Sequence, residues 1–194
     1  MKYLTLILFT FLIGCTSSES LIQTDSTAGW KTENGGTWTA KNGILYGEKK
    51  ASNPKHALLI SDNEYANFKL TMEYKAINGN SGFYFRLAPE KNAVGYKGYH
   101  AEIDTNGTNA GGLYDVAVAW MNKPDPKLAA KAFKKDEWNF MEIIAVGDQI
   151  DISLNGIKMT SLKDQRSSKG KLGIQLHSNE NTKIKFRNIQ IIKL

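Results

Sequence analysis

The chain has 194 residues, with 25 Lys and Arg against 19 Asp and Glu, and a formal net charge of +6. This mild positive excess is spread along the sequence without the basic stripe of a nucleic-acid-binding protein, so we expect no nucleic-acid partner. The length suits one domain, and the single cysteine excludes an internal disulfide, so the hydrophobic core has to supply the stability.

Residues 1–14 predict a secretory signal peptide. Lys2 precedes an apolar run over residues 3–13, which is too short for a membrane span of about 20 residues. The segment LIGC that ends at Cys15 resembles the lipobox of bacterial lipoproteins, and this resemblance implies cleavage before Cys15 and a lipid on its sulfur. The alternative is an ordinary signal peptide that happens to end at a cysteine. We expect the lipoprotein, because a lone cysteine in an exported chain has no disulfide partner.

Residues 15–28 are expected to form a lipidated tether. They are mostly small and polar and have no sustained period, which is typical of a flexible linker. Thr16 and Ser17 do not resemble an inner-membrane retention signal, which favours anchoring at the outer membrane of the cell envelope. Residues 29–194 are then expected to form one domain.

Alternation of apolar and polar residues predicts antiparallel β-structure in this domain. Residues 68–75 have the period of a half-buried strand. Residues 142–146 and 149–154 predict a hairpin. Asn155-Gly156 predicts a tight turn into the next strand, because both residues tolerate a positive φ.

The remaining elements indicate an all-β fold. We expect only one short helix, over residues 126–133. The terminal segment 183–194 alternates with one break of phase near Asn188, which predicts a β-bulge. Many short strands separated by evenly spaced turns are typical of an antiparallel β-sandwich or barrel. We expect the sandwich, whose outer sheet face can hold a ligand.

The segment 98–115, GYHAEIDTNGTNAGGLYD, is unusually polar for a strand and the turn that follows it. His100, Glu102 and Asp104 are spaced by two, so they point to one face of a strand. Three ionisable groups on one face suit a ligand site, a metal site or acid–base chemistry. A plain solvent-facing strand is the alternative interpretation.

Two further polar clusters lie on predicted strands. Gln175 and His177 share a face, and His177 is a candidate base, acid or metal ligand, or simply a surface residue. Tyr84 and Arg86 share another face, and Arg86 is a candidate partner of the carboxylates or an oxyanion binder. A structural salt bridge is the alternative role for Arg86.

The four tryptophans divide into one ligand candidate and three core candidates. Trp120 lies in a predicted loop and is the best candidate for a platform on which a sugar ring stacks. Trp30, Trp38 and Trp138 are expected to belong to the core. The motifs of serine hydrolases, zinc proteases and phosphate-binding loops are absent from the sequence.

Five segments, in order along the chain, resemble the 3-keto-disaccharide hydrolase domain family. The segments are YANFKLTMEYKAINGNSGFYFR, GYHAEID, GGLYD, DEWNFMEIIAVGDQIDISLNG, and GKLGIQLH with KFRNIQI. The resemblance covers residues 29–194. It implies a concanavalin A-like jelly roll that acts on glycosides carrying a ketone at C3 of the sugar.

The implied reaction begins with removal of the C2 proton, which the C3 ketone acidifies. The enolate then expels the C1 oxygen, and water adds to give net hydrolysis. Carried onto this sequence, the resemblance implies His177 or Glu102 as the base, Arg86 as the enolate stabiliser and Asp104 as a ligand or orienting group. It also implies Tyr114 and Asp115, in GGLYD, as substrate-binding residues.

Substrate contacts are further expected from His100, Gln175 and Trp120. No cofactor is firmly implied, but a divalent cation held by Glu102, Asp104 and His177 is an alternative enolate stabiliser. The motif GYHAEID differs from the commoner family form GYEVQI at His100 and Glu102, which leaves the acid and base assignments open.

Two other functions compete with the hydrolase. One is a lipid-anchored carbohydrate-binding module without catalytic activity, and the other is a protein-interaction sandwich of the envelope. Convergence of Arg86, Glu102, Asp104 and His177 on one pocket would favour the enzyme.

Overall fold

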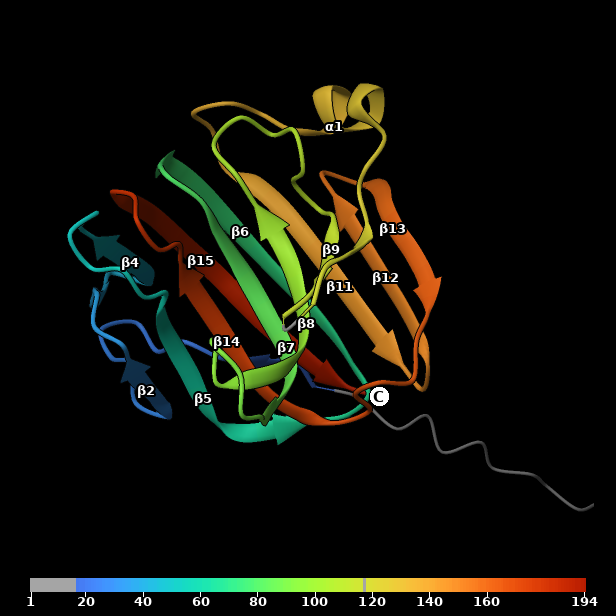
Figure 1. Cartoon of the computed structure of the whole chain (residues 1–194), viewed down its shortest axis with the longest axis horizontal. Helices are drawn as coiled ribbons and strands as arrows, with labels where there is room; N and C mark the ends of the chain where they lie inside the picture. Colours follow the sequence, from blue (N-terminus) through green and yellow to red (C-terminus); the bar gives the residue numbers. More distant parts are fainter. Residues whose placement is uncertain (1–16, 117) are drawn as a thin grey trace, which may run out of the picture.

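A computed structural model describes residues 17–116 and 118–194 of the chain. Two antiparallel sheets pack face to face, and the short helix α1 (Pro126–Ala132) lies at one end of them (Figure 1). The expected all-β antiparallel sandwich is confirmed.

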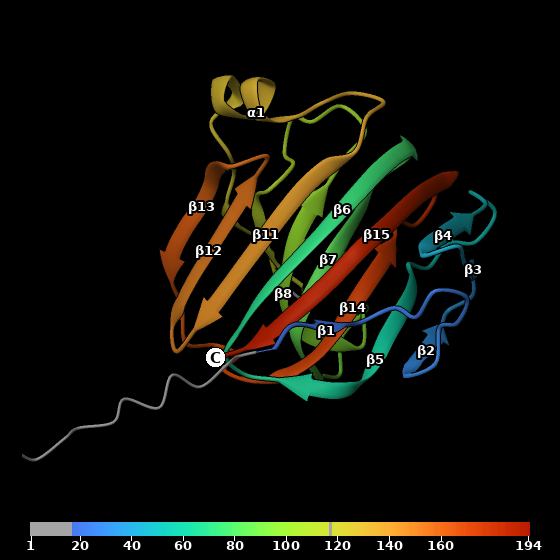
Figure 2. The ribbon, with the colours of Figure 1, turned by 180° about the vertical axis from the view of Figure 1, so that it is seen from behind.

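The first sheet has eight strands, with β6 and β15 at its centre; Figure 2 shows it from behind. Its strand order is β13-β12-β11-β6-β15-β4-β3, with β1 pairing separately to β15. The strands are β1 (Glu19–Ser20), β3 (Thr37–Lys41), β4 (Ile44–Lys49), β6 (Phe68–Asn78), β11 (Asn139–Val146), β12 (Gln149–Leu154), β13 (Ile157–Lys163) and β15 (Thr182–Lys193).

The second sheet has seven strands in the order β10-β9-β8-β7-β14-β5-β2. The strands are β2 (Trp30–Glu33), β5 (Ala57–Tyr65), β7 (Ser81–Pro89), β8 (Tyr96–Ile103), β9 (Leu113–Asp115), β10 (Trp120–Asn122) and β14 (Gly170–Leu176). Because β5 and β7 flank β14 in antiparallel fashion, the starts of β5 and β7 meet the end of β14.

The core lies between the sheets and is built by the alternation that the sequence predicts. On β6, Phe68, Leu70, Met72 and Tyr74 are fully buried, and the polar residues between them face outward. Burial of such side chains contributes roughly 1.5–3 kcal/mol each. Alternation therefore fixes which face of each strand belongs to the core.

The predicted local features are present. Asn155 and Gly156 have φ values of 49° and 81° and join β12 to β13. Asn188 has a φ of 52°, and the pairing of β15 with β6 shifts register there, as expected for a bulge. Helix α1 begins after Asp125, whose side chain accepts hydrogen bonds from two backbone N–H groups of the first turn.

One tryptophan expectation is wrong. Trp30 and Trp38 pack against the core, but Trp138 lies on the surface side, where the guanidinium of Arg187 sits 4.1 Å from its ring centroid. The pair is a cation–π contact rather than a core contact. The residue after it, Asn139, begins strand β11 instead.

The expected boundary of the tether is also wrong, because the chain is docked well before residue 29. Strand β1 pairs with the end of β15, Leu21 is buried, and the indole N–H of Trp30 donates to the carbonyl of Leu21 at 2.7 Å. Cys15 and the signal peptide lie outside the described residues. No helix within the described residues is long and apolar enough to span a bilayer.

Candidate functional site

A cavity of about 300 Å³ opens on the outer face of the seven-stranded sheet. We call it the catalytic pocket, after the role that we propose for it below. Phe83 and Phe85 point into the core, whereas Tyr84 between them points out to the pocket. The lining residues come from five strands and from positions just outside them. They are His56, Asn80, Tyr84, Val94, His100, Glu102, Asn109, Tyr114, Val116, Trp120, Gln175 and His177.

A row of rings crosses the sheet along the pocket. Trp120, Tyr114, His100 and Tyr84 are direct neighbours on β10, β9, β8 and β7. Their successive ring centroids are 5.2, 6.4 and 4.6 Å apart, with edge-to-face geometry. Trp120 and Tyr114 are partly exposed, so this end of the row offers aromatic surface to a ligand.

Gly82 makes the room that His100 occupies. A Cβ at position 82 would lie 1.5 Å from His100 Nε2, a distance that no side chain can accommodate. Gly82 is also the direct partner of Glu102 in the β7–β8 pairing. The glycine therefore lets the imidazole lie across β7 and form the pocket floor beside Glu102.

His100 and Glu102 form a neutral pair on that floor. Burial lowers the pKa of His100 to about 3, and burial together with the charges of Asp104 and Glu180 raises the pKa of Glu102 to about 8. Glu102 Oε2 lies 3.8 Å from His100 Nε2. Since both groups are neutral at pH 7, this contact is not an ion pair, and Glu102 is a protonated acid.

Buried polar atoms on the floor lack partners. Among the described residues, nothing hydrogen bonds to His100 Nε2 or to Gln175 Oε1. The Gln175 Nε2 amide donates to the Tyr84 hydroxyl at 2.5 Å, which leaves the phenol proton available. Unpaired buried polar atoms are costly, so their presence in a cavity indicates a polar ligand.

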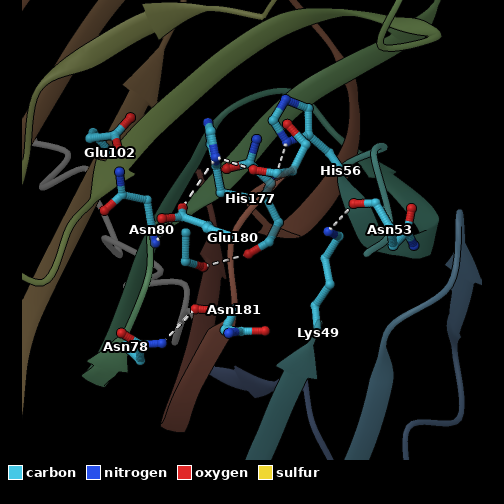
Figure 3. A network of polar contacts seen from close by, with 12 residues as sticks. Lys49, Asn53, His56, Asn78, Asn80, Glu102, His177, Glu180 and Asn181 are labelled. Carbon is cyan, nitrogen blue, oxygen red and sulfur yellow. Dashed lines mark hydrogen bonds and ion pairs between the residues drawn. The ribbon is translucent and has the colours of Figure 1, made fainter. Parts of the chain in front are cut away.

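His177 belongs to a second pair on the rim, with Glu180. Nδ1 of His177 lies 3.1 Å from Glu180 Oε1 and 2.9 Å from the carbonyl of Ser178, so the Nδ1 proton is held by two acceptors. The same Glu180 oxygen accepts the Asn80 N–H at 2.8 Å (Figure 3). This arrangement places the lone pair of His177 on Nε2, as a general base requires.

His56 completes the rim as a neutral donor. Its ring lies edge-on to His177 with centroids 4.8 Å apart, and its Nδ1 accepts the Ser178 N–H at 3.0 Å. Burial, with the charges of His177 and Lys49 as further causes, lowers the pKa of His56 to about 4. Neutral His56 therefore carries its proton on Nε2, where it can donate to a developing oxyanion.

Arg86 is not part of the pocket, and its expected role as enolate stabiliser is wrong. It has a φ of 51°, at a bulge where the β7–β8 and β7–β14 registers shift. This break of alternation removes Arg86 from the face of Tyr84. Its guanidinium is fully buried and donates to the carbonyls of Ala66, Gly147 and Ser167 at 2.9, 2.9 and 3.3 Å.

Asp104 and Asp115 also lie away from the pocket lining. Strand β8 ends at Ile103, so the alternation stops before Asp104, whose Oδ2 accepts the Asn109 N–H at 2.8 Å. Asp115 points to the face opposite Tyr114 and pairs with Arg166 at 2.5 Å. Asp104 influences the pocket only through its charge, which helps to raise the pKa of Glu102.

The three candidate metal ligands do not come together. Within the described residues, no group of three or more His, Cys, Asp or Glu side chains could hold a metal ion. Glu102 is on the pocket floor and His177 is on the rim. Asp104 instead accepts a hydrogen bond from Asn109, within the loop that follows β8. Of the four residues whose convergence would favour the enzyme, only Glu102 and His177 line the pocket. The other expected site residues that line it are His100, Tyr114, Trp120 and Gln175.

The sequence did not point to His56, Asn80 or Glu180 as site residues. Each lies one to four residues outside a strand, in a segment without periodicity. The signal that could have found them is the pairing itself, since His56 precedes β5, Asn80 precedes β7, and both strands flank β14. The sequence places Tyr84 on an alternating strand but does not predict its hydrogen bond with Gln175.

Comparison with known proteins gives one family. The model of the 3-keto-alpha-glucoside-1,2-lyase-like domain matches residues 17–192. No curated protein sequence matches the chain.

Several solved structures share the fold. A candidate glycosyl hydrolase of Parabacteroides distasonis superimposes with a TM-score of 0.70 at 20% identity, over 91% of this chain and 94% of that one. A carbohydrate-binding module of Bacillus subtilis gives 0.64 at 17% identity, over 85% and 96%. A Bacillus subtilis protein of unknown function with a galectin-like fold gives 0.63 at 14%, over 84% and 89%. These likenesses confirm the expected jelly-roll fold.

Proposed function

The chain belongs to the 3-keto-alpha-glucoside-1,2-lyase-like family, and from this premise we propose that it hydrolyses glycosides that carry a ketone at C3. The observation that supports this most is the pairing, in one pocket, of a protonated carboxyl with an oriented imidazole. Glu102 has its pKa raised to about 8, chiefly by burial, and His177 is held by Glu180. An acid and a base poised together are what β-elimination next to a ketone requires.

In the proposed first step, Nε2 of His177 removes the C2 proton. The C–H electron pair forms the C2–C3 double bond of an enolate, and the negative charge moves to the C3 oxygen. The neutral Nε2–H of His56 and the Tyr84 hydroxyl are the donors for this oxygen, in the role first expected of Arg86.

In the second step, the enolate re-forms the ketone and the bond from C1 to the leaving oxygen breaks. Glu102 gives its proton to that oxygen, which departs as an alcohol, and a C1–C2 double bond remains. Water then adds across this bond, with its oxygen at C1 and a proton at C2. The sum is hydrolysis, with no net change in oxidation state.

The experiment is to follow a nitrophenyl 3-keto-glucoside with the purified protein in D₂O, with and without divalent metal. The proposal predicts nitrophenol release and deuterium at C2 of the product, and the ordinary glucoside without the ketone should stay intact. His177→Gln should lose both release and exchange. Absence of release from the keto-substrate under every condition would overturn the proposal.

A second candidate function is supported by the aromatic end of the pocket. Trp120 and Tyr114 present partly exposed rings, and the fold is shared with a carbohydrate-binding module. A binding module predicts sugar affinity that is lost in Trp120→Ala but unchanged in His177→Gln, with no release of nitrophenol from any substrate.

We also propose that the protein is anchored to the cell envelope by lipid on Cys15, with the outer membrane favoured. The support is the LIGC segment and the lone cysteine. Metabolic labelling with an alkyne fatty acid should mark the wild-type protein and not Cys15→Ala, which should move to the soluble fraction. Equal labelling of both proteins would contradict the anchor.

A further inference from the structure

A second cavity, of about 470 Å³, lies beside the catalytic pocket, and we call it the lysine basin. It is bordered by the ends of strands β3, β4, β6 and β15. Its lining residues have polar side chains apart from Gly36: Gly36, Thr37, Glu48, Lys49, Lys50, Asn53, Asn78, Asn181, Thr182 and Lys183. The proposed reaction assigns no role to any of these side chains.

The basin and the catalytic pocket share one wall. Three segments between strands form it, and each gives residues to both cavities (Figure 3). The basin side has Asn53, Asn78 and Thr182, and the pocket side has His56, Asn80 and His177. The basin is therefore a neighbour of the pocket, built by the same segments, and not a part of it.

Lys49 is the buried cation of the basin. Its side chain donates to the carbonyl of Asn53 at 2.6 Å and to that of Lys50 at 3.3 Å, and the residue is only 6% exposed. An ammonium has three N–H donors, so one is left. Among the described residues, no carboxylate lies within ion-pair distance of Lys49, although Glu180 acts on it from further away. A buried cation without a carboxylate partner is suited to an anionic ligand.

Thr182 provides a second, independent observation. It is 2% exposed, it lines the basin, and its Oγ1 has no hydrogen-bond partner among the described residues. A buried hydroxyl without a partner costs about 1–3 kcal/mol unless a ligand or water satisfies it. Its position next to the Lys49 side of the cavity places a neutral donor and acceptor beside the cation.

Two amides add hydrogen-bonding groups that the fold does not use. Asn78 gives its Nδ2 to the carbonyl of Asn181 at 2.8 Å, which leaves its Oδ1 free within the described chain. Asn181 accepts the Ala51 N–H on Oδ1 at 3.0 Å, which leaves its Nδ2. Amides and hydroxyls that both donate and accept are suited to sugar hydroxyl groups.

The charge balance of the basin is positive. Lys183 pairs with Glu48 at 2.7 Å, so these two charges offset each other. Lys49 and Lys50 are left without a carboxylate partner among the described residues. The cavity is far larger than an inorganic anion needs, and its polar groups extend well beyond the lysines.

We infer that the lysine basin binds a carboxylated saccharide, with the carboxylate at Lys49 and the hydroxyl groups at Thr182, Asn78 and Asn181. This inference does not depend on the reaction proposed for the catalytic pocket. A site for acidic sugar beside a glycoside-cleaving pocket would hold the protein on acidic glycans that contain its substrate.

The test is titration of the purified protein with glucuronate, followed by calorimetry and by NMR of the asparagine side-chain amides. We expect binding at least tenfold tighter than that of glucose or of inorganic phosphate at equal ionic strength. The amide signals of Asn78 and Asn181 should shift. Equal affinity for glucose or for phosphate, or shifts confined to the residues of the catalytic pocket, would overturn the inference.

Variants separate a binding role from a structural one. Lys49→Met should weaken glucuronate binding at least tenfold, and Thr182→Val, which keeps the shape of the side chain, should weaken it several-fold. Lys55→Met removes one exposed charge from the same segment outside the basin lining and should bind as wild type does. If Lys49→Met unfolds, the Thr182→Val variant provides the test. Glucuronate binding that is unchanged in Thr182→Val would contradict the inference. Glucuronate binding without nitrophenol release would support the basin and refute the proposed hydrolysis.

Discussion

Arg86 on β7 and Glu102 on β8 are both ionisable, both largely buried and both on the same sheet, but their surroundings are opposite. Three backbone carbonyls accept hydrogen bonds from the Arg86 guanidinium. Within the described residues, no hydrogen bond to the Glu102 carboxyl is found, and His100 Nε2 lies 3.8 Å from its Oε2. The fold supplies the hydrogen-bond partners of Arg86, whereas a partner for the Glu102 carboxyl has to come from a ligand.

The contrast shows how to separate structural from functional polar groups in this protein. A buried cation that is fully hydrogen bonded stabilises the segments that supply its acceptors, here the β5–β6 turn and the β11–β12 turn. A buried acid without partners is destabilising, and such groups persist where chemistry uses them. Burial alone therefore does not mark the site.

The largest effect on the rate is expected when the Glu102 carboxyl is replaced by an amide. Glu102→Gln cannot deliver a proton, so release of nitrophenol from the 3-keto-glucoside should fall roughly 10²–10⁴-fold. Exchange of the C2 proton should continue, because His177 is untouched. Loss of exchange and release together, in a folded variant, would contradict the assignment of Glu102 as the acid. Nearly wild-type release would show that the acid lies elsewhere.

Arg86→Met tests the structural role of the buried guanidinium. It leaves three carbonyl groups without donors, at about 1–3 kcal/mol each, so the free energy of unfolding should drop by roughly 3 kcal/mol or more. Urea denaturation followed by tryptophan fluorescence measures this loss. Arg86→Lys, which keeps the charge and part of the hydrogen bonding, is the matched control and should lose less. The activity per folded molecule should change only a few-fold, and a thousandfold loss would show that Arg86 takes part in the reaction.

The pH dependence of the rate should report Glu102 directly. Its pKa is raised to about 8, chiefly by burial, so the active, protonated form is lost above that value. We expect the rate to fall about tenfold for each pH unit beyond it. Glu102→Gln should lack this alkaline limb. A limb that stays in the variant would belong to another group.

The same carboxyl also links stability to pH. The unfolded pKa of a Glu is about 4.3, so between that value and about 8 the folded state holds one more proton than the unfolded state. The free energy of unfolding should therefore fall as the pH rises through this window. In Glu102→Gln this contribution is absent, and a series of thermal melts against pH would show a flatter curve.

The smallest effect concerns the aromatic end of the pocket. Trp120→Ala removes a ring from the row, and the loss of its stacking should raise KM roughly three- to tenfold, with kcat nearly unchanged. Trp138→Ala removes a ring that contacts Arg187 instead and serves as the control for loss of an aromatic side chain. A larger fall in kcat than rise in KM for Trp120→Ala would mean that the ring positions the reacting atoms.

Sequence periodicity predicted most of the fold and about half of the site. Residues on regular strands were placed correctly: His100 and Glu102 share a face, and so do Gln175 and His177. Errors occurred where alternation stops. Arg86 sits at a bulge, and Asp104 follows the last residue of β8.

The remaining site residues depend on pairings between distant strands. His56 and His177 are brought together because β5 and β14 are neighbours, and local spacing carries no information about that. Glu180 is only three residues from its partner His177, but both lie between β14 and β15, where alternation does not predict which side chains meet. Family resemblance supplied the fold type but not these contacts.

The short strand β1 has a consequence for how the protein would stand on a bilayer. On the proposal that Cys15 carries lipid, only three residues separate it from Glu19, and the four Cα–Cα steps between them reach at most about 14 Å. Glu19 pairs with Ile191, near one end of β15. Thr182 begins the other end of that strand, nine residues earlier, and is thus roughly 30 Å away. The lysine basin and the rim residues His56 and His177 would then face away from the membrane. Most of the length of the sandwich would lie between them and the lipid.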